Sequence, residues 1–289
     1  MYKIAILGTE NTHAMAFSRY INIPGADGKK PFPDMEVIGV YGNEASTEAI
    51  MRETGVKLAA RSPDEFLGKV DAVMVTARKG SLHVSYAKPY AEAGLPLFMD
   101  KPFTSDYAEA KEFIKLLKDK KVLISGGSAV KHSPAVHAIK AFVDGLMGGG
   151  EFITGTLNFN VVPDSEHDGL FFYASHLIET ALAVFGEDVK TVTAVRKNDS
   201  ITAVFGYENF DATLLFTAGA EKCAGTIYGK KDIKHFPIDI STVYAEEIRI
   251  FHNMLVKKTM PQNYKSMILP VKLIEKIDRA YKTGKTVRV

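Results

Sequence analysis

Short apolar runs alternate with helix-like segments along the first part of the chain, and this alternation restricts the fold more than any other feature. Residues 4–7 form a continuous apolar run that Gly8 closes, which is typical of a strand buried on both faces of a parallel sheet. Residues 12–22 then carry apolar side chains at roughly helical spacing, and residues 37–41 form the next apolar run. These segments predict one strand–helix–strand unit.

The same alternation continues to residue 125. The Ser-Pro-Asp-Glu segment at residues 62–65 predicts the start of a short helix, since Ser is a good N-cap and Pro fits the first helical position. Strands are expected at residues 72–75, 96–99 and 122–125, and helices at residues 81–93 and 110–117. This order predicts an α/β domain with a doubly wound parallel sheet over residues 1–125.

A different pattern begins at residue 126. Ser133 and Pro134 open a predicted helix that the glycines at residues 148–150 end. From residue 153 to residue 161, apolar and polar residues alternate with the two-residue period of a half-solvated strand. Further β-like runs follow at residues 190–196, 201–206, 210–217 and 222–228. Residues 126–289 therefore predict an α+β domain with an open, mainly antiparallel sheet and a few helices on one face.

The composition argues against several classes of function. The chain has 36 Lys and Arg against 34 Asp and Glu, a net charge of +2, which is too balanced for a surface that binds nucleic acid or an anionic membrane. A small-molecule partner is therefore expected. The one cysteine, Cys223, fits a reducing compartment, and neither a signal peptide nor an apolar run long enough to span a membrane is expected. We therefore expect a cytoplasmic protein.

The carboxyl ends of parallel strands are where an open α/β sheet binds its ligands. The segment after the first strand, residues 8–13, keeps only the first glycine of a dinucleotide-binding fingerprint, and a plain strand-to-helix turn capped by Asn11 or Thr12 is the alternative. After the second strand, Tyr41 stands where an acid usually accepts the ribose hydroxyls. Tyr41 can stack on an adenine ring, or it can be an edge residue without function.

Asp100 and Lys101 follow the strand at residues 96–99, with Pro102 after them. A lysine at this edge of the sheet can hydrogen-bond a substrate oxygen and compensate the charge that develops on it, and Asp100 would orient the lysine. An ordinary surface ion pair is the alternative interpretation.

A second group of candidates lies on a predicted helix that ends at Phe185. Helical spacing places four side chains on adjoining positions of one face: Phe172, Tyr173, His176 and Glu179. A histidine that titrates near neutral pH is a natural proton carrier, and Tyr173 can share a hydrogen bond with His176. The alternative is a buried structural histidine. The acidic loop at residues 164–168 matches no metal-binding spacing, so no metal site is expected there.

The order and spacing of these features resemble the glucose–fructose oxidoreductase and inositol dehydrogenase family, written Gfo/Idh/MocA, over nearly the whole chain. The features that carry the resemblance include the segment at residues 62–67, Thr76, His83, the Asp100-Lys101-Pro102 motif, Ser133-Pro134, and the segment from Asp168 to His176. The resemblance implies an N-terminal Rossmann domain that binds NAD or NADP. It also implies a C-terminal open sheet that builds a homo-oligomer (a dimer or tetramer), and hydride transfer at a CH–OH or carbonyl carbon of a sugar or cyclic polyol.

The resemblance also implies roles for individual residues. Catalysis falls to Lys101 and His176, with Tyr173 as a helper. For the cofactor, the resemblance implies Thr76, His83, Asp100 and Lys101, and the ends of the first two strands add Gly8, Asn11, Thr12, His13 and Tyr41 as candidates. The substrate-binding residues it implies are Lys101, Lys131, Asp168 and His176.

Three departures from the family pattern keep alternatives open. The first loop lacks further glycines, Tyr41 stands where an acid is common, and Phe172 stands where many members carry an Asp that can orient the histidine. Backbone N–H groups at the helix start can still bind phosphate. Besides an NAD(P)-dependent oxidoreductase, the sequence allows a non-catalytic ligand-binding or regulatory protein. It also allows a member that uses tightly bound NAD transiently in elimination or hydrolysis.

Overall fold

The computed structural model describes residues 1–241 and 243–289, which form two compact units. Unit 1 comprises Met1–Gly127 and Tyr244–Met267, and unit 2 comprises Ser128–Val243 and Ile268–Val289. The division drawn from the sequence instead assigned all of residues 126–289 to the C-terminal domain. Residues 244–267 thus form part of the N-terminal unit.

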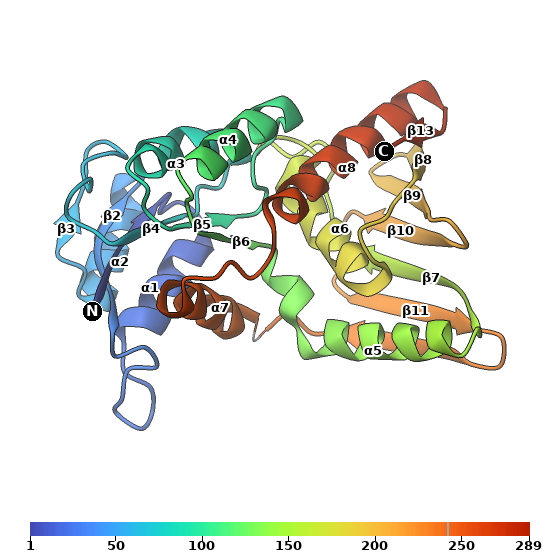
Figure 1. Ribbon diagram of the computed structural model, residues 1–289, viewed down its shortest axis with the longest axis horizontal. Coiled ribbons are helices and arrows are strands. Elements are labelled where there is room, and N and C mark those ends of the chain that lie inside the picture. Colours follow the sequence, from blue (N-terminus) through green and yellow to red (C-terminus); the bar gives the residue numbers. More distant parts are fainter. Residues whose placement is uncertain (242) are drawn as a thin grey trace. The chain divides into compact units, whose positions relative to one another are not determined.

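Unit 1 is built on a six-stranded parallel sheet, sheet A, in the order β3-β2-β1-β4-β5-β6 (Figure 1). Its strands are β1 (Tyr2–Leu7), β2 (Met35–Tyr41), β3 (Leu58–Ala59), β4 (Ala72–Val75), β5 (Leu97–Asp100) and β6 (Ile124–Gly127). Its helices include α1 (Thr12–Asn22), α2 (Glu44–Thr54), η1 (Gly80–Leu82), α3 (His83–Glu92) and α4 (Tyr107–Asp119). The strand order reverses at β1, so the predicted doubly wound sheet is confirmed.

The helix α7 (Val243–Lys257) explains why a late segment of the chain belongs to unit 1. Its Phe251 is fully buried, and the Phe251 ring centroid lies 5.8 Å from that of Phe98 on β5. Tyr244 makes an edge contact with Phe17 of α1 at the same centroid separation of 5.8 Å, and Figure 1 shows α7 next to α1. The apolar face of α7 therefore completes the core of unit 1.

The short helix predicted from residues 62–65 is wrong, because residues 62–69 form turns. The Glu65 carboxylate folds back and accepts the backbone N–H groups of Arg61 and Ser62 at 2.8 and 2.9 Å. The helix α2 was not anticipated from the sequence. Its buried side chains are only Thr47, Ile50 and Thr54, so its amphipathic pattern is weak.

Unit 2 is built on a seven-stranded sheet, sheet B, in the order β12-β11-β7-β10-β9-β8-β13. Its strands are β7 (Phe152–Phe159), β8 (Thr191–Lys197), β9 (Ser200–Gly206), β10 (Asp211–Thr217), β11 (Cys223–Gly229), β12 (Ile233–Ile238) and β13 (Val287–Arg288). In the described part of the chain, only the β10–β7 pair of this sheet is parallel, so the expected mainly antiparallel sheet is confirmed.

The helices of unit 2 bury the apolar side chains of sheet B. They are η2 (Ala129–His132), α5 (Pro134–Gly148) and α6 (Phe171–Phe185), together with the part of α8 (Tyr264–Thr283) that begins at Ile268. Their apolar side chains form one core cluster with inward residues of the strands, such as Leu157, Ala203 and Leu214. Among the described residues, no helix is long and apolar enough to cross a membrane.

Candidate functional site

Three of the predicted cofactor residues meet where β1 ends. Gly8 has a φ of +107°, and a Cβ built on it would lie 2.2 Å from the backbone nitrogen of Ala77, so only glycine fits. The Gly8 N–H donates to the Tyr41 carbonyl at 2.7 Å, and the Thr76 hydroxyl donates to the Gly8 carbonyl at 2.9 Å. The loop after β1 is thereby attached to the ends of both neighbouring strands.

Asp100, at the end of β5, is fully buried and holds together the next group of predicted residues. One carboxylate oxygen, Oδ2, lies 2.6 Å from Nδ1 of His13 and accepts the Asn11 side-chain amide at 3.2 Å. The other oxygen, Oδ1, accepts the backbone N–H of Lys101 at 2.7 Å. Asn11 also caps α1, because its side-chain oxygen accepts the His13 N–H at 3.2 Å. Side chains of the first loop are therefore tied to the strand end that carries Lys101.

The environment of Asp100 favours its ionised form. Burial by itself raises the pKa of Asp100, but the charge and hydrogen bond of His13, with a further contribution from Lys101, hold the pKa below its ordinary value of 3.8. Lys101 is 4% exposed and follows directly. The sheet edge thus carries a buried, ionised carboxylate next to a lysine, rather than the exposed ion pair of the alternative interpretation.

The depressed pKa of Asp100 predicts that unit 1 loses stability in acid. As the pH falls, the unfolded chain binds a proton on Asp100 before the folded chain does, so the stabilisation is complete above about pH 4 and is lost as the pH falls through the lower pKa of the folded state. The double variant with His13→Gln and Asp100→Asn contains neither group. Urea unfolding at several pH values below about 5 should show a steeper loss in the wild type, by at most about 1.4 kcal/mol per pH unit. Parallel curves for the two proteins would contradict this prediction.

Tyr41 has a partner that was not anticipated from the sequence. The Tyr86 ring on α3 makes an edge contact with Tyr41 at a centroid separation of 5.3 Å. Burial and the neighbouring Tyr41 raise the pKa of Tyr86, so the Tyr86 phenol is protonated at neutral pH. The aromatic pair lies at the end of β2, where a dinucleotide-binding sheet receives the adenosine part. Nothing in the local sequence pattern indicates this pair, because Tyr86 lies on a separate helix.

The remaining predicted cofactor residues differ in what surrounds them. His83 is fully buried, and its Nε2 donates to the Ala77 carbonyl at 2.7 Å. Burial lowers the pKa of His83, so the ring is neutral and fastens the segment after β4. Thr12 is the first residue of α1 and is exposed. The backbone N–H groups at this helix start remain suited to a phosphate.

Unit 2 contains a buried polar cluster around His176, which we call the His176 cluster: Ser128, Lys131, His176 and Glu179. The Ser128 hydroxyl lies 2.7 Å from Nδ1 of His176, and the Ser128 backbone N–H donates to the Glu179 carboxylate at 2.8 Å. Lys131 donates to the same Glu179 oxygen at 2.8 Å. His176 and Glu179 are each 7% exposed. The predicted shared face of α6 therefore forms part of a charged cluster rather than an apolar core.

Ser128 was missed as a site residue although a signal for it exists. It directly follows β6, and polar residues after parallel strands are the same signal that singled out Asp100. Ser128 lies 48 residues before His176, however, so no local spacing connects the two.

The other predicted residues of α6 lie around the His176 ring. Tyr173 is 39% exposed, and its ring centroid is 5.4 Å from that of His176. The Phe172 ring makes edge contacts with His167 and Tyr173, at 4.9 and 4.6 Å between centroids. Asp168 lies in the loop before α6 with a positive φ of 68°. Phe172 thus packs against the rings of His167 and Tyr173. The hydrogen bond to Nδ1 of His176 comes from Ser128.

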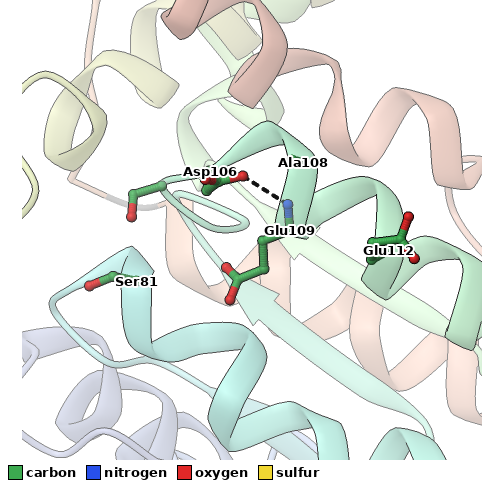
Figure 2. A pocket seen from close by; sticks show the side chains of 6 residues that line it. Ser81, Asp106, Ala108, Glu109 and Glu112 are labelled. Carbon is green, nitrogen blue, oxygen red and sulfur yellow. Dashed lines mark hydrogen bonds between the residues drawn. The ribbon is translucent and has the colours of Figure 1, made fainter.

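A surface hollow in unit 1 is lined by none of the predicted site residues. Figure 2 shows it at the start of α4, lined by Ser81, Ser105, Asp106, Ala108, Glu109 and Glu112. Asp106 is the helix cap and accepts the Glu109 N–H at 2.8 Å, so part of this acidity serves the helix start. Within residues 1–241 and 243–289, no group of three or more His, Cys, Asp or Glu side chains is placed to hold a metal ion.

Comparison with known proteins places these observations in context. Residues 2–128 match the family model described as "Oxidoreductase family, NAD-binding Rossmann fold". Inositol 2-dehydrogenase of Rhizobium meliloti (strain 1021) is 26% identical over 156 residues, which are 52% of this chain and 47% of the relative. The chain thus aligns with about half the length of this curated relative.

Solved structures share the whole fold at low sequence identity. The structure of myo-inositol 2-dehydrogenase from Lactobacillus plantarum has a TM-score of 0.82 at 15% identity, over 100% of this chain and 99% of that chain. The structure of scyllo-inositol dehydrogenase from Lactobacillus casei, with bound NAD(H) and scyllo-inositol, has a TM-score of 0.82 at 14% identity, with the same coverage. These structures show that the chain has the same fold.

Proposed function

The chain belongs, through residues 2–128, to the Gfo/Idh/MocA oxidoreductase family, whose N-terminal domain is an NAD-binding Rossmann fold, and we propose that it is an NAD(P)-dependent dehydrogenase. Its proposed substrate is a cyclic polyol or sugar, which is oxidised at a CH–OH group. In the reverse reaction the corresponding carbonyl compound is reduced. The observation that carries the proposal is buried Lys101, whose backbone N–H donates to buried Asp100 at the same sheet edge as the Gly8 loop. Relatives named inositol dehydrogenases support the polyol class.

The residues of unit 1 fit a dinucleotide. The close packing of Gly8 on Ala77 and the start of α1 suit the pyrophosphate, and Tyr41 with Tyr86 offers aromatic surface to the adenine. A nicotinamide dinucleotide held by these residues would supply the hydride-transfer chemistry. Asp100 is hydrogen-bonded to His13, Asn11 and the Lys101 N–H, so its proposed role is to position the loop and Lys101.

The protein's own groups handle the substrate oxygen and its proton. Lys101 hydrogen-bonds that oxygen and compensates the negative charge that develops on it. His176 takes the hydroxyl proton in the oxidation and returns it in the reduction, with Tyr173 as a helper and with Lys131 and Asp168 as proposed substrate contacts. The proposal does not require an Asp in place of Phe172 to orient the histidine, because Ser128 already binds the His176 ring.

Two further features belong to the proposal. Assembly into a dimer or tetramer through sheet B, which the family resemblance implies, is part of the proposal. The single cysteine and the balanced charge support a cytoplasmic protein with a small-molecule substrate and without nucleic acid or membrane partners.

We expect NADH to bind at least about 10-fold more tightly than NADPH, which corresponds to about 1.4 kcal/mol. The segment from Tyr41 to Glu48 contains no Lys or Arg for a 2′-phosphate, and Glu44 in the first turn of α2 would repel it. Calorimetry with both dinucleotides measures the difference. Glu44→Gln should narrow it, whereas Glu48→Gln, another exposed acid of α2, should have less effect.

The same titrations test the proposed function. Binding of NADH, followed by NAD-dependent oxidation of one member of a panel of inositols and sugars, would support it. Binding without turnover of any panel member or its ketone would favour a regulatory protein. If a nucleotide-free sample binds neither NADH nor NADPH, the proposed function is wrong.

A further inference from the structure

The hydrogen bonds of Ser128 bear on which of the two ring nitrogens of His176 carries the proton. Ser128 is fully buried. Its Oγ accepts the backbone N–H of Val130 at 3.2 Å, and it lies 2.7 Å from Nδ1 of His176. A hydroxyl has one proton to donate, whereas a neutral imidazole has one nitrogen that donates and one that accepts. The pair therefore has two arrangements, and they differ in which ring nitrogen carries hydrogen.

The surroundings of Ser128 favour one of these arrangements. Within residues 1–241 and 243–289, Nδ1 of His176 is the only hydrogen-bond acceptor that the Ser128 hydroxyl reaches. If Nδ1 carried the ring proton and donated it to Oγ, the buried hydroxyl proton would be left without an acceptor, which is unfavourable. With the hydroxyl donating to Nδ1, the Ser128 hydroxyl and Nδ1 are both satisfied and the ring proton lies on Nε2.

We propose that Ser128 is a positioning residue that holds resting, neutral His176 as the Nε2–H tautomer. This inference rests on the proposed role of His176 as the proton carrier. The ring then offers an N–H group at Nε2 to a substrate oxygen. An aspartate bound to Nδ1 would instead accept a hydrogen bond from Nδ1–H and leave Nε2 as the acceptor.

The tautomer determines what must happen before the ring acts as a base. Nε2 can take the proton of a substrate hydroxyl only when the neutral ring carries its hydrogen on Nδ1. The Ser128 hydroxyl must then turn away and become an acceptor of Nδ1–H. Once Nε2 is protonated, the imidazolium carries hydrogen on both nitrogens, and it returns the Nε2 proton in the reverse reaction. Ser128 therefore disfavours protonation of His176.

The two charged members of the His176 cluster keep Ser128 in place. Glu179, one turn further along α6, accepts the Ser128 backbone N–H, and Lys131 of η2 neutralises it through a salt bridge of 2.8 Å. Tyr173 is a further titratable group in contact with the ring, and β7 contributes the Phe159 ring at 5.1 Å between centroids. Glu179 and Lys131 compensate each other's charge, and Ser128 is the hydrogen-bond partner of Nδ1.

Nitrogen NMR on the full chain with labelled histidine tests the tautomer, with His176→Asn used to assign the His176 signals. The expected result is an Nε2–H tautomer for neutral His176 in the wild type. In Ser128→Ala, the titration midpoint of His176 should rise by about one pH unit, since a hydrogen bond that favours the neutral form is lost. Ser128→Thr keeps the hydroxyl and should restore the wild-type midpoint.

Ser133→Ala is the matched control. Ser133 is also fully buried and caps a helix by accepting the Val136 N–H at 3.2 Å, but among the described residues no histidine contacts its hydroxyl. Ser133→Ala should cost similar stability and leave the His176 midpoint unchanged. An Nδ1–H tautomer in the wild type, or a midpoint that is unchanged or lower in folded Ser128→Ala, would overturn the inference. Both signals are read without substrate, so failure of the proposed reaction shows separately, as an unchanged kcat in His176→Asn.

Discussion

Replacement of Lys101 by methionine is expected to lower kcat by about 10²-fold or more, which is the effect of removing one preorganised group that stabilises developing charge. Lys101 is 4% exposed at the end of β5, so methionine keeps most of the buried stem and removes only the ammonium group. The binding of NADH should change little. Steady-state oxidation of the identified polyol, measured through the formation of NADH, gives kcat and KM for both proteins.

The control for this variant is Lys69→Met, which removes an exposed cation of unit 1 in the turns before β4. It should leave kcat within about twofold of the wild type, since surface charges away from a site contribute little. Thermal unfolding of both variants separates a loss of fold from a loss of chemistry. If folded Lys101→Met keeps the wild-type kcat, the proposed role of Lys101 is wrong.

His176→Asn is expected to lower kcat by about 10²- to 10⁴-fold, the range that general acid–base catalysis provides. The kcat profile should also lose a titration near neutral pH, because asparagine carries no proton in that range. The asparagine amide can still accept a hydrogen bond from the Ser128 hydroxyl, which lies 2.7 Å from Nδ1 in the wild type, so the cluster keeps its packing. Rates measured across the neutral range with both proteins test this expectation.

His137→Asn is the matched control, because His137 is an exposed histidine on α5 of the same unit. Its pH profile should match that of the wild type. A wild-type pH profile in His176→Asn, together with a lower melting temperature, would identify His176 as a structural histidine. Tyr173, which is 39% exposed and in ring contact with His176, would then be the remaining candidate on α6, and Tyr173→Phe would test it.

Elements with strong local signals were predictable from the sequence. The apolar runs of β1, β4 and β5 are fully buried, as continuous apolar strands of a parallel sheet should be. α2 and the turns at residues 62–69 were not predictable. The first has few apolar positions, and in the second the Glu65 side chain forms local hydrogen bonds that compete with a helix.

The sequence also identified individual candidate residues but not their partners. Lys101 and His176 stood out by residue type and by their place after a strand or on a helix face. His13 and Asp100 are 87 residues apart, and Ser128 and His176 are 48 residues apart, so no spacing rule connects either pair. The same limit applies to Tyr41 and Tyr86, which lie on different elements.

By itself, the sequence determined the alternation of strands and helices, the doubly wound sheet, the second, mainly antiparallel sheet and the positions of the candidate residues. These follow from hydrophobic periodicity and from residue preferences at strand and helix ends, which act over a few neighbouring residues. Only the tertiary structure decided three further features. Helix α7 packs with unit 1, the buried Asp100 carboxylate contacts His13 instead of solvent, and Ser128 binds the His176 ring. The physical reason is that hydrogen bonds and apolar contacts depend on distance in space, and folding brings distant parts of the chain together in ways that local patterns do not encode.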